Sequence, residues 1–249
     1  MKQTSIIDEI ATDVYTVLPN VKKGVPDDRK ANIELYNEDN MALMARYPDN
    51  HFDLAIVDPP YGINIHKMNF TQSTKGGVAK RNDYSSITDW DKAVPTKEYF
   101  NELFRVSKNQ IIWGGNYFDL PLTSSWIIWD KKTEEKYSND FADGEMAWTS
   151  FDKPMRIFRS LWSGMLQHDM KDKQKRIHPT EKPIRLYGHL INKYCKKGFK
   201  VLDTHLGSGS IALACHKYNI DLVGCEINKE YYKNALRRLE NEQSQQSLF

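Results

Sequence analysis

An acidic residue, two prolines and a tyrosine directly follow an apolar run in the stretch AIVDPPYGI, residues 55–63. The run predicts a buried strand, so Asp58 is expected at its carboxyl end, where open α/β sheets place their chemistry. Pro59 and Pro60 fix φ and remove two backbone donors, and Tyr61 adds a flat aromatic face. Together, a carboxylate, a carbonyl and a ring suit the binding of an exocyclic amino group on a planar heterocycle. The alternative is an Asp-Pro-Pro turn that only ends the strand.

A second candidate site is the glycine loop in VLDTHLGSGSIALACHKY, residues 201–218. Asp203 ends a predicted strand, a Gly-Ser-Gly turn follows, and an apolar helix is expected after it. Glycines let the backbone approach a ligand closely at the carboxyl ends of strands. Glu226 ends the next predicted strand, where a carboxylate can accept both hydroxyls of a ribose. A third glycine is missing, so the pattern indicates a nucleoside-like ligand without a pyrophosphate; the alternative is an ordinary strand-to-helix turn.

Three blocks of the sequence resemble those of the S-adenosylmethionine-dependent DNA amino-methyltransferases. They are DPPYG (58–62), HPTEKP (178–183) and DTHLGSG (203–209), in that order along the chain. The order is similar to that of the β class, whose members methylate adenine N6 or cytosine N4. The resemblance runs from about Ile33 to Leu239 and includes the weaker blocks WGGNYF (113–118) and WIIWDK (126–131).

The resemblance implies a role for individual residues. Asp58, the carbonyl of Pro59, Pro60 and Tyr61 would hold and activate the target amino group. The cofactor S-adenosylmethionine, with S-adenosylhomocysteine as product and no metal, would be bound by Asp39, His178, Thr180, Lys182, Asp203, His205, Leu206, Gly207, Ser208, Gly209, Ser210 and Glu226. For Asp39 the alternative is a helix N-cap, and for Lys182 a solvated surface charge. His205 stands where the family usually has phenylalanine and is expected to stack there.

Two long polar segments are predicted to contact DNA, because a base must leave the duplex stack before its amino group can react. Residues 64–90 are expected to form a mobile flap that orders on DNA. Residues 152–177 are expected to form a small target-recognition insertion. The basic residues of both segments suit phosphate contacts, and the alternative for the second is a solvated basic loop. These residues are Lys67, Lys75, Lys80, Arg81, Arg156, Arg159, Lys171, Lys173, Lys175 and Arg176.

The elements that must position these residues alternate between strands and helices, which indicates an α/β fold with a doubly wound, mostly parallel sheet. The resemblance implies a seven-stranded, Rossmann-like methyltransferase sheet in a single domain over residues 1–249. Strands are expected at 52–57, 110–114, 125–129, 145–151, 199–203 and 221–227. Helices are expected at 97–106, 183–195 and 229–243, with Pro183 at a first helical position and Tyr232 on the apolar face of the last.

Composition limits the choice of function. The chain holds 35 Lys plus Arg and 33 Asp plus Glu, a formal net charge of +2, which excludes a histone-like polycation. Its three cysteines form no C-x-x-C pair and lie in apolar runs, so buried thiols are expected rather than a disulfide framework or a metal site. No apolar leader or membrane-length run is present, which favours a cytoplasmic protein of a bacterium, plasmid or phage.

The leading hypothesis is a site-specific methyltransferase that modifies N6 of a flipped-out adenine in DNA. DPPY is commoner in adenine enzymes, and a cytosine-N4 enzyme is the alternative. A second alternative is a catalytically weak DNA-binding accessory protein, because Thr204-His205 departs from the family pattern. The recognition sequence, a homodimeric state and a companion restriction endonuclease are left open by the sequence.

Overall fold

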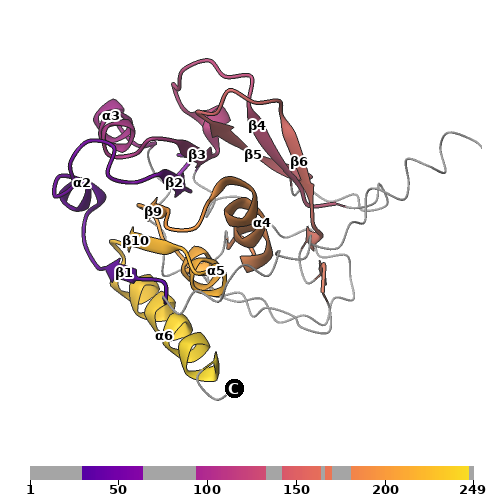
Figure 1. Cartoon of the computed structure of the whole chain (residues 1–249). Coiled ribbons are helices and arrows are strands. Elements are labelled where there is room, and N and C mark those ends of the chain that lie inside the picture. The colour runs from indigo at the N-terminus through magenta and orange to yellow at the C-terminus, as the bar shows by residue number, and fades with distance from the viewer. Residues whose placement is uncertain (1–29, 64–93, 133–141, 164–165, 170–180, 247–249) are drawn as a thin grey trace, which may run out of the picture. The chain divides into compact units, whose positions relative to one another are not determined.

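A central sheet of eight strands organises the described part of the chain (Figure 1). The computed structural model describes residues 30–63, 94–132, 142–163, 166–169 and 181–246. The chain divides into two units, Met1–Lys30 and Ala31–Phe249, and every described helix and strand belongs to the second unit.

The strand order in the large sheet is β1-β10-β9-β2-β3-β5-β4-β6. Only β5 runs antiparallel to its neighbours β3 and β4, and the other paired strands are parallel. This confirms the α/β class with a mostly parallel sheet, although the sheet has eight strands rather than seven. The strands are β1 (Ile33–Tyr36), β2 (Leu54–Val57), β3 (Gln110–Trp113), β4 (Trp126–Asp130), β5 (Gly144–Thr149), β6 (Arg156–Arg159), β9 (Lys200–Asp203) and β10 (Asp221–Cys225), with a separate pair β7 (Trp162–Ser163) and β8 (Leu166–Gln167).

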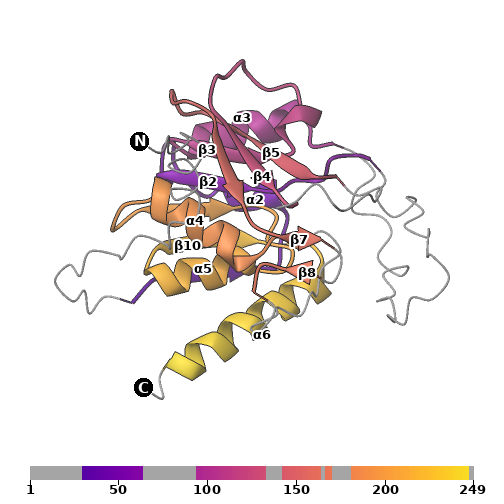
Figure 2. The same ribbon diagram turned by 90° about the vertical axis from the view of Figure 1, so that its right-hand side faces the viewer.

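Helices cover both faces of the sheet (Figures 1 and 2). Helices α4 (Ile184–Tyr194) and α5 (Ser210–Tyr218) pack on one face, and α2 (Asn40–Met44) and α3 (Lys97–Val106) pack on the other. Helix α6 (Lys229–Gln246) packs against α5 and β1. The 3-10 helix η2 (Gly115–Tyr117) follows β3 directly.

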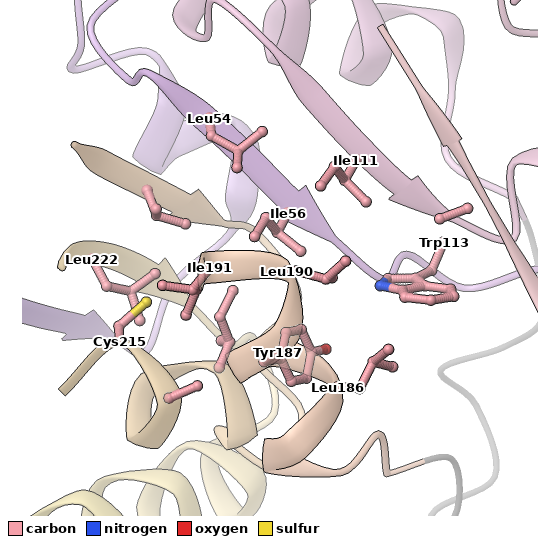
Figure 3. Close-up of a cluster of buried hydrophobic side chains, with 14 of the residues drawn as sticks. Leu54, Ile56, Ile111, Trp113, Leu186, Tyr187, Leu190, Ile191, Cys215 and Leu222 are labelled. Carbon is pink, nitrogen blue, oxygen red and sulfur yellow. The ribbon is translucent and has the colours of Figure 1, made fainter. Parts of the chain in front are cut away.

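Alternating side chains of the central strands supply the two hydrophobic clusters on either side of the sheet. Leu54 and Ile56 of β2 join the cluster with α4 and α5, while Ala55 and Val57 join the cluster with α2 and α3. Successive side chains of a strand point to opposite faces, so a strand covered on both faces must be apolar throughout. Figure 3 shows the first cluster, in which Trp113 at the end of β3 extends toward α4.

The structure departs from the expected elements at a few positions. Strands β1 and β6 were not expected, and β6 falls within residues 152–177. On α6 the buried positions are Tyr231, Ala235 and Leu239, so Tyr231 rather than Tyr232 faces the core. Pro183 is the N-cap of α4 and not its first helical residue.

Two further expectations concern the cysteines, which were expected to be buried thiols, and the absence of a membrane-length apolar segment. Cys215 and Cys225 are buried, Cys195 is partly exposed, and all three are free thiols. Across the described ranges, every helix is too short or too polar to span a bilayer.

Candidate active site

Four carboxylates meet at one edge of the sheet. Asp58 directly follows β2 and Asp203 ends β9, and these two strands pair in parallel. Glu226 follows β10 in the same direction. Because the carboxyl ends of parallel strands lie at one edge, these side chains share the position where such sheets bind ligands. Glu145 reaches the same edge from the opposite chain direction, because it lies near the start of the antiparallel β5.

Asp58 is held by two side chains in the free protein. The Tyr61 hydroxyl donates to Asp58 Oδ1 at 2.7 Å, and the Lys182 ammonium lies 2.5 Å from Asp58 Oδ2. Lys182 Nζ also lies 3.3 Å from the Tyr61 hydroxyl oxygen. The Lys182 side chain is 2% exposed, so it is not the solvated surface charge considered as its alternative. Its described polar contacts are with Asp58, Tyr61 and Glu145; its cofactor role stays a prediction.

Glu145 is a site residue that the sequence interpretation missed. Its carboxylate forms ion pairs with Lys182, 3.0 Å from Oε2, and with Lys131. Burial alone would raise the pKa of Glu145, but the two ammonium groups outweigh it and lower that pKa to about 2. Burial alone would lower the pKa of Lys182, but the carboxylates of Asp58 and Glu145 outweigh it and raise that pKa. A single acid in the otherwise apolar run EMAW is the signal that could have pointed to it.

The Tyr61 ring is fixed by aromatic neighbours and by a glycine. It stacks on Tyr117 with ring centroids 5.1 Å apart and an interplanar angle of 14°, and it contacts the edge of Phe118 at 6.1 Å. Gly114 has φ +68°, and a Cβ there would lie 2.2 Å from Tyr61 Cε1. Tyr117 is 47% exposed, so the stack opens toward solvent on the Tyr117 side. The block WGGNYF therefore supports the DPPY tyrosine.

The glycine loop has the close backbone packing that its sequence predicts. Gly207 and Gly209 have φ values of 49° and 72°, a conformation in which glycine is favoured. A Cβ on Gly209 would lie 2.7 Å from Cβ of Ala235 on α6. Glu226 accepts hydrogen bonds from the backbone N–H groups of Gly207 at 2.9 Å and Asn228 at 2.8 Å, and burial raises its pKa.

Asp203 is a buried carboxyl group at the start of this loop. Its Oδ1 accepts a hydrogen bond from the backbone N–H of His205 at 2.9 Å. Burial raises the pKa of Asp203 to about 8, so the site favours the neutral carboxyl group or a nearby positive charge.

His205 contacts an aromatic ring of α3 and a polar side chain of α2. Its ring lies edge-on to Tyr99 of α3 at 5.4 Å, and its nitrogens lie 2.9 Å from Thr204 Oγ1 and 3.2 Å from Asn40 Nδ2. The Tyr99 hydroxyl is 2.7 Å from Thr204 Oγ1. Burial lowers the pKa of His205 to about 4, so the ring is neutral at physiological pH. Thr204 and His205 thus form an ordered network with α2 and α3.

Arg238 of α6 is a second residue that the sequence interpretation missed. Its guanidinium donates to the carbonyl oxygen of Ser208 at 2.6 Å and lies 3.3 Å from Glu181 Oε1. Ser208 and Ser210 hydroxyls lie 3.0 Å apart, and Ser210 also contacts Glu181 at 3.5 Å. Arg238 therefore joins the glycine loop to the described end of the HPTEKP block.

The remaining predicted residues fall into three groups. Asp39 is the exposed N-cap of α2 and accepts from the backbone N–H groups of Met41 and Ala42, as the alternative interpretation expected. Pro59 and Leu206 are buried beside the site residues. Outside the described residues lie the 64–90 segment and His178, Thr180, Lys67, Lys75, Lys80, Arg81, Lys171, Lys173, Lys175 and Arg176.

Arg156 and Arg159 are exposed on the edge strand β6, but at its opposite ends. Strand β6 pairs in parallel with β4, with Arg156 beside Ile127 and Arg159 beside Asp130. Arg159 therefore lies at the sheet edge that carries Asp58, and its Nε is 3.3 Å from Asp130 Oδ2. Arg156 lies roughly 10 Å farther along the strand.

The described residues contain no group of three or more His, Cys, Asp or Glu side chains that could hold a metal ion. The carboxylates at the sheet edge are instead compensated by lysine or by backbone N–H groups.

Comparisons with known proteins identify the family of the chain. The DNA methylase family model (N6_N4_Mtase) matches residues 99–237. This chain belongs to the DNA methylase family. The methylase is 27% identical over 233 residues to the Type II methyltransferase M.HpaI of Haemophilus parainfluenzae, covering 78% of this chain and 70% of the relative.

Solved structures share the fold of this methylase. The M1.HpyAVI–SAM complex aligns with a TM-score of 0.53 at 20% identity, covering 83% of this chain and 100% of that chain. The PvuII DNA methyltransferase (cytosine-N4-specific) aligns with a TM-score of 0.53 at 13% identity, covering 86% and 91%.

Proposed function

We propose that this DNA methylase transfers a methyl group from S-adenosylmethionine to N6 of an adenine that is flipped out of DNA. The observation that carries the proposal is the placement of Asp58 beside Tyr61 at the carboxyl edge of the sheet, next to the glycine loop. M1.HpyAVI has been solved as a complex with SAM, and M.HpaI is a Type II methyltransferase, which supports this donor and a restriction–modification setting.

The acceptor half of the proposed reaction takes place at Asp58 and its neighbours. An exocyclic amino group has two N–H donors, and Asp58 and the carbonyl of Pro59 each accept a hydrogen bond from one of them. Those hydrogen bonds draw the nitrogen lone pair out of conjugation with the ring. The amino nitrogen attacks the methyl carbon as the carbon–sulfur bond breaks, and the surplus proton passes to Asp58 or to water. Tyr61 and Tyr117 supply aromatic surface for the extruded base.

The donor half fits the residues of the glycine loop. S-adenosylmethionine supplies a methyl group on a positively charged sulfur when it is bound. Asp203, whose burial disfavours an unpaired negative charge, would bind the positively charged methionine part. Glu226, already oriented by Gly207 and Asn228, would bind the ribose hydroxyls. Gly207 and Gly209 let the backbone approach the methionine part closely.

Methylation mapping tests the proposal directly. The full-length protein is incubated with unmethylated plasmid DNA and labelled S-adenosylmethionine, and the modified bases are mapped at single-base resolution. We expect N6-methyladenine within one short sequence; N4-methylcytosine at that site would replace the adenine assignment with the alternative. Asp58→Ala should abolish transfer and retain cofactor binding. Transfer that survives in Asp58→Ala would contradict the mechanism, and DNA binding without any transfer by the wild type would favour the accessory-protein alternative.

The length of the expected recognition segment bears on the assembly of the methylase. The expected recognition segment, residues 152–177, is short for reading sequence, which favours a short site or a homodimer that shares the task. The mass of the complex on DNA distinguishes these two. Resistance of the mapped site to a restriction endonuclease of the same specificity would link the methylase to a nuclease partner.

A further inference from the structure

Both oxygens of Asp58 are in contact with the chain's own donors. Oδ1 accepts from the Tyr61 hydroxyl at 2.7 Å, and Oδ2 lies 2.5 Å from the Lys182 ammonium. An amino group brought to Asp58 therefore meets a protonated nitrogen that already occupies an acceptor position. Lys182 thus has its ammonium against the carboxylate to which an exocyclic amino group is expected to donate.

Lys182 also has a second carboxylate within reach. Glu145 Oε2 lies 3.0 Å from Lys182 Nζ. This oxygen is fully buried, and within the described residues no aligned hydrogen bond satisfies it, although the ammonium is close. Glu145 thus has unused acceptor capacity that faces Lys182. Lys182 Nζ therefore lies within ion-pair distance of both Asp58 and Glu145.

We propose that Lys182 is a stand-in for the target amino group, which holds Asp58 while the site is empty and moves to Glu145 when the base enters. The proposal rests on the function given above and adds two positioning residues to it. An ammonium group that is buried without a counter-charge is strongly destabilising. The Lys182 side chain is 2% exposed and that of Asp58 is 19% exposed, so Lys182 needs a carboxylate partner whether or not the base is bound. Glu145 then keeps the buried ammonium of Lys182 paired while the base is bound, and the amino group of the base donates to Asp58 in place of Lys182.

Glu145→Gln tests the second half of this exchange. Glutamine preserves the shape but removes the charge that draws Lys182 away, so Lys182 stays on Asp58 and competes with the base. We expect the single-turnover methylation rate on plasmid DNA with tritiated S-adenosylmethionine to fall by about tenfold or more, with cofactor affinity within about twofold of wild type. Glu102→Gln is the matched control, because Glu102 forms a surface ion pair with Arg105 on α3 at 2.6 Å. That variant should keep the wild-type rate.

A double-mutant cycle shows whether Glu145 acts through Lys182. With Lys182→Met as background there is no ammonium to draw away, so adding Glu145→Gln should slow transfer by less than about twofold. An equal loss in both backgrounds would overturn the proposal, because Glu145 would then act independently of Lys182. An unchanged rate in Glu145→Gln alone would overturn it as well.

Lys131→Met keeps the proposal testable if the Lys182→Met proteins do not fold. Lys131 is the other partner of Glu145, so its removal strengthens the attraction of Glu145 for Lys182. We expect a single-turnover rate at or above that of the wild type. A loss as large as that of Glu145→Gln would show that Glu145 serves only to join β4 to β5, and would overturn the proposal. A wild type that transfers no methyl group would overturn the proposed function too, whereas an active wild type with an unaffected Glu145→Gln overturns this inference alone.

Discussion

Gly114→Ala should displace the Tyr61 ring and slow methyl transfer while leaving the fold intact. Gly114 has φ +68°, and its added Cβ would lie 2.2 Å from Tyr61 Cε1 and 2.5 Å from Cδ1. The ring must move by roughly 1 Å to restore van der Waals contact, and its hydroxyl moves with it. That hydroxyl donates to Asp58, so the acceptor site is distorted at its centre.

The expected loss of stability in Gly114→Ala has two parts, one from the strained backbone and one from the contact of the new methyl group with Tyr61. Alanine in the left-handed region costs about 1–2 kcal/mol of stability, and overpacking adds about 1–3 kcal/mol. Misplacement of a positioning group by about 1 Å can cost about a hundredfold in rate. We therefore expect a single-turnover rate about a hundredfold below wild type, with S-adenosylmethionine affinity within about twofold.

Gly198→Ala is a matched control for the backbone part. Gly198 has φ +83°, and a Cβ there would meet no described atom within 4 Å. This variant should lose about 1–2 kcal/mol of stability through strain alone and keep the wild-type rate. Thermal unfolding and single-turnover methylation of both variants provide the comparison. If Gly114→Ala is as active as Gly198→Ala, the contact between Gly114 and Tyr61 does not position the acceptor site.

Three further predictions concern DNA, the cofactor and pH. Arg159→Ala should weaken DNA binding and reduce by about 1 the slope of the logarithm of the DNA binding constant against the logarithm of salt concentration. Arg156→Ala should change both quantities less, because Arg156 lies farther from the sheet edge that carries Asp58. Equal effects of the two substitutions in a salt titration would contradict this placement. Arg238→Met removes the donor to the Ser208 carbonyl and should raise the dissociation constant of S-adenosylmethionine about tenfold, as measured by calorimetry. A higher cofactor concentration should restore the methylation rate. An unchanged affinity would refute a role of Arg238 in positioning the loop. Burial raises the pKa of Asp203 to about 8 from 3.8, so the unfolded chain loses this proton first and wild-type stability falls as pH rises between those values. Asp203→Asn lacks this effect, so its stability relative to wild type should increase from pH 5 to pH 8 by about 1–3 kcal/mol in urea unfolding; a constant difference would contradict the raised pKa.

The alternation of apolar runs and amphipathic segments was sufficient to predict much of the fold. A strand buried on both faces must be continuously apolar, so runs such as FDLAIV and QIIWG were recognisable. The edge strand β6, RIFR, is covered less and has exposed arginines at both ends, so its sequence carries no such signal. On α6 a single position of the buried face was assigned wrongly: Tyr232 was expected there, whereas Tyr231 is buried, and the two adjacent side chains are chemically alike.

The sequence by itself determined the two halves of the candidate site, since Asp58, Tyr61, Asp203 and the loop glycines follow strands in a readable order. Only the tertiary structure showed what joins those halves. Lys182 is distant from Asp58 in sequence, and it reaches that carboxylate because it lies just before α4, which packs on the sheet in one cluster with Leu54 and Ile56 of β2. Glu145 reaches the same edge because β5 runs antiparallel, a direction that no local pattern of residues encodes. Ion pairs between distant segments depend on strand order and direction, and these are set by the packing of the whole sheet.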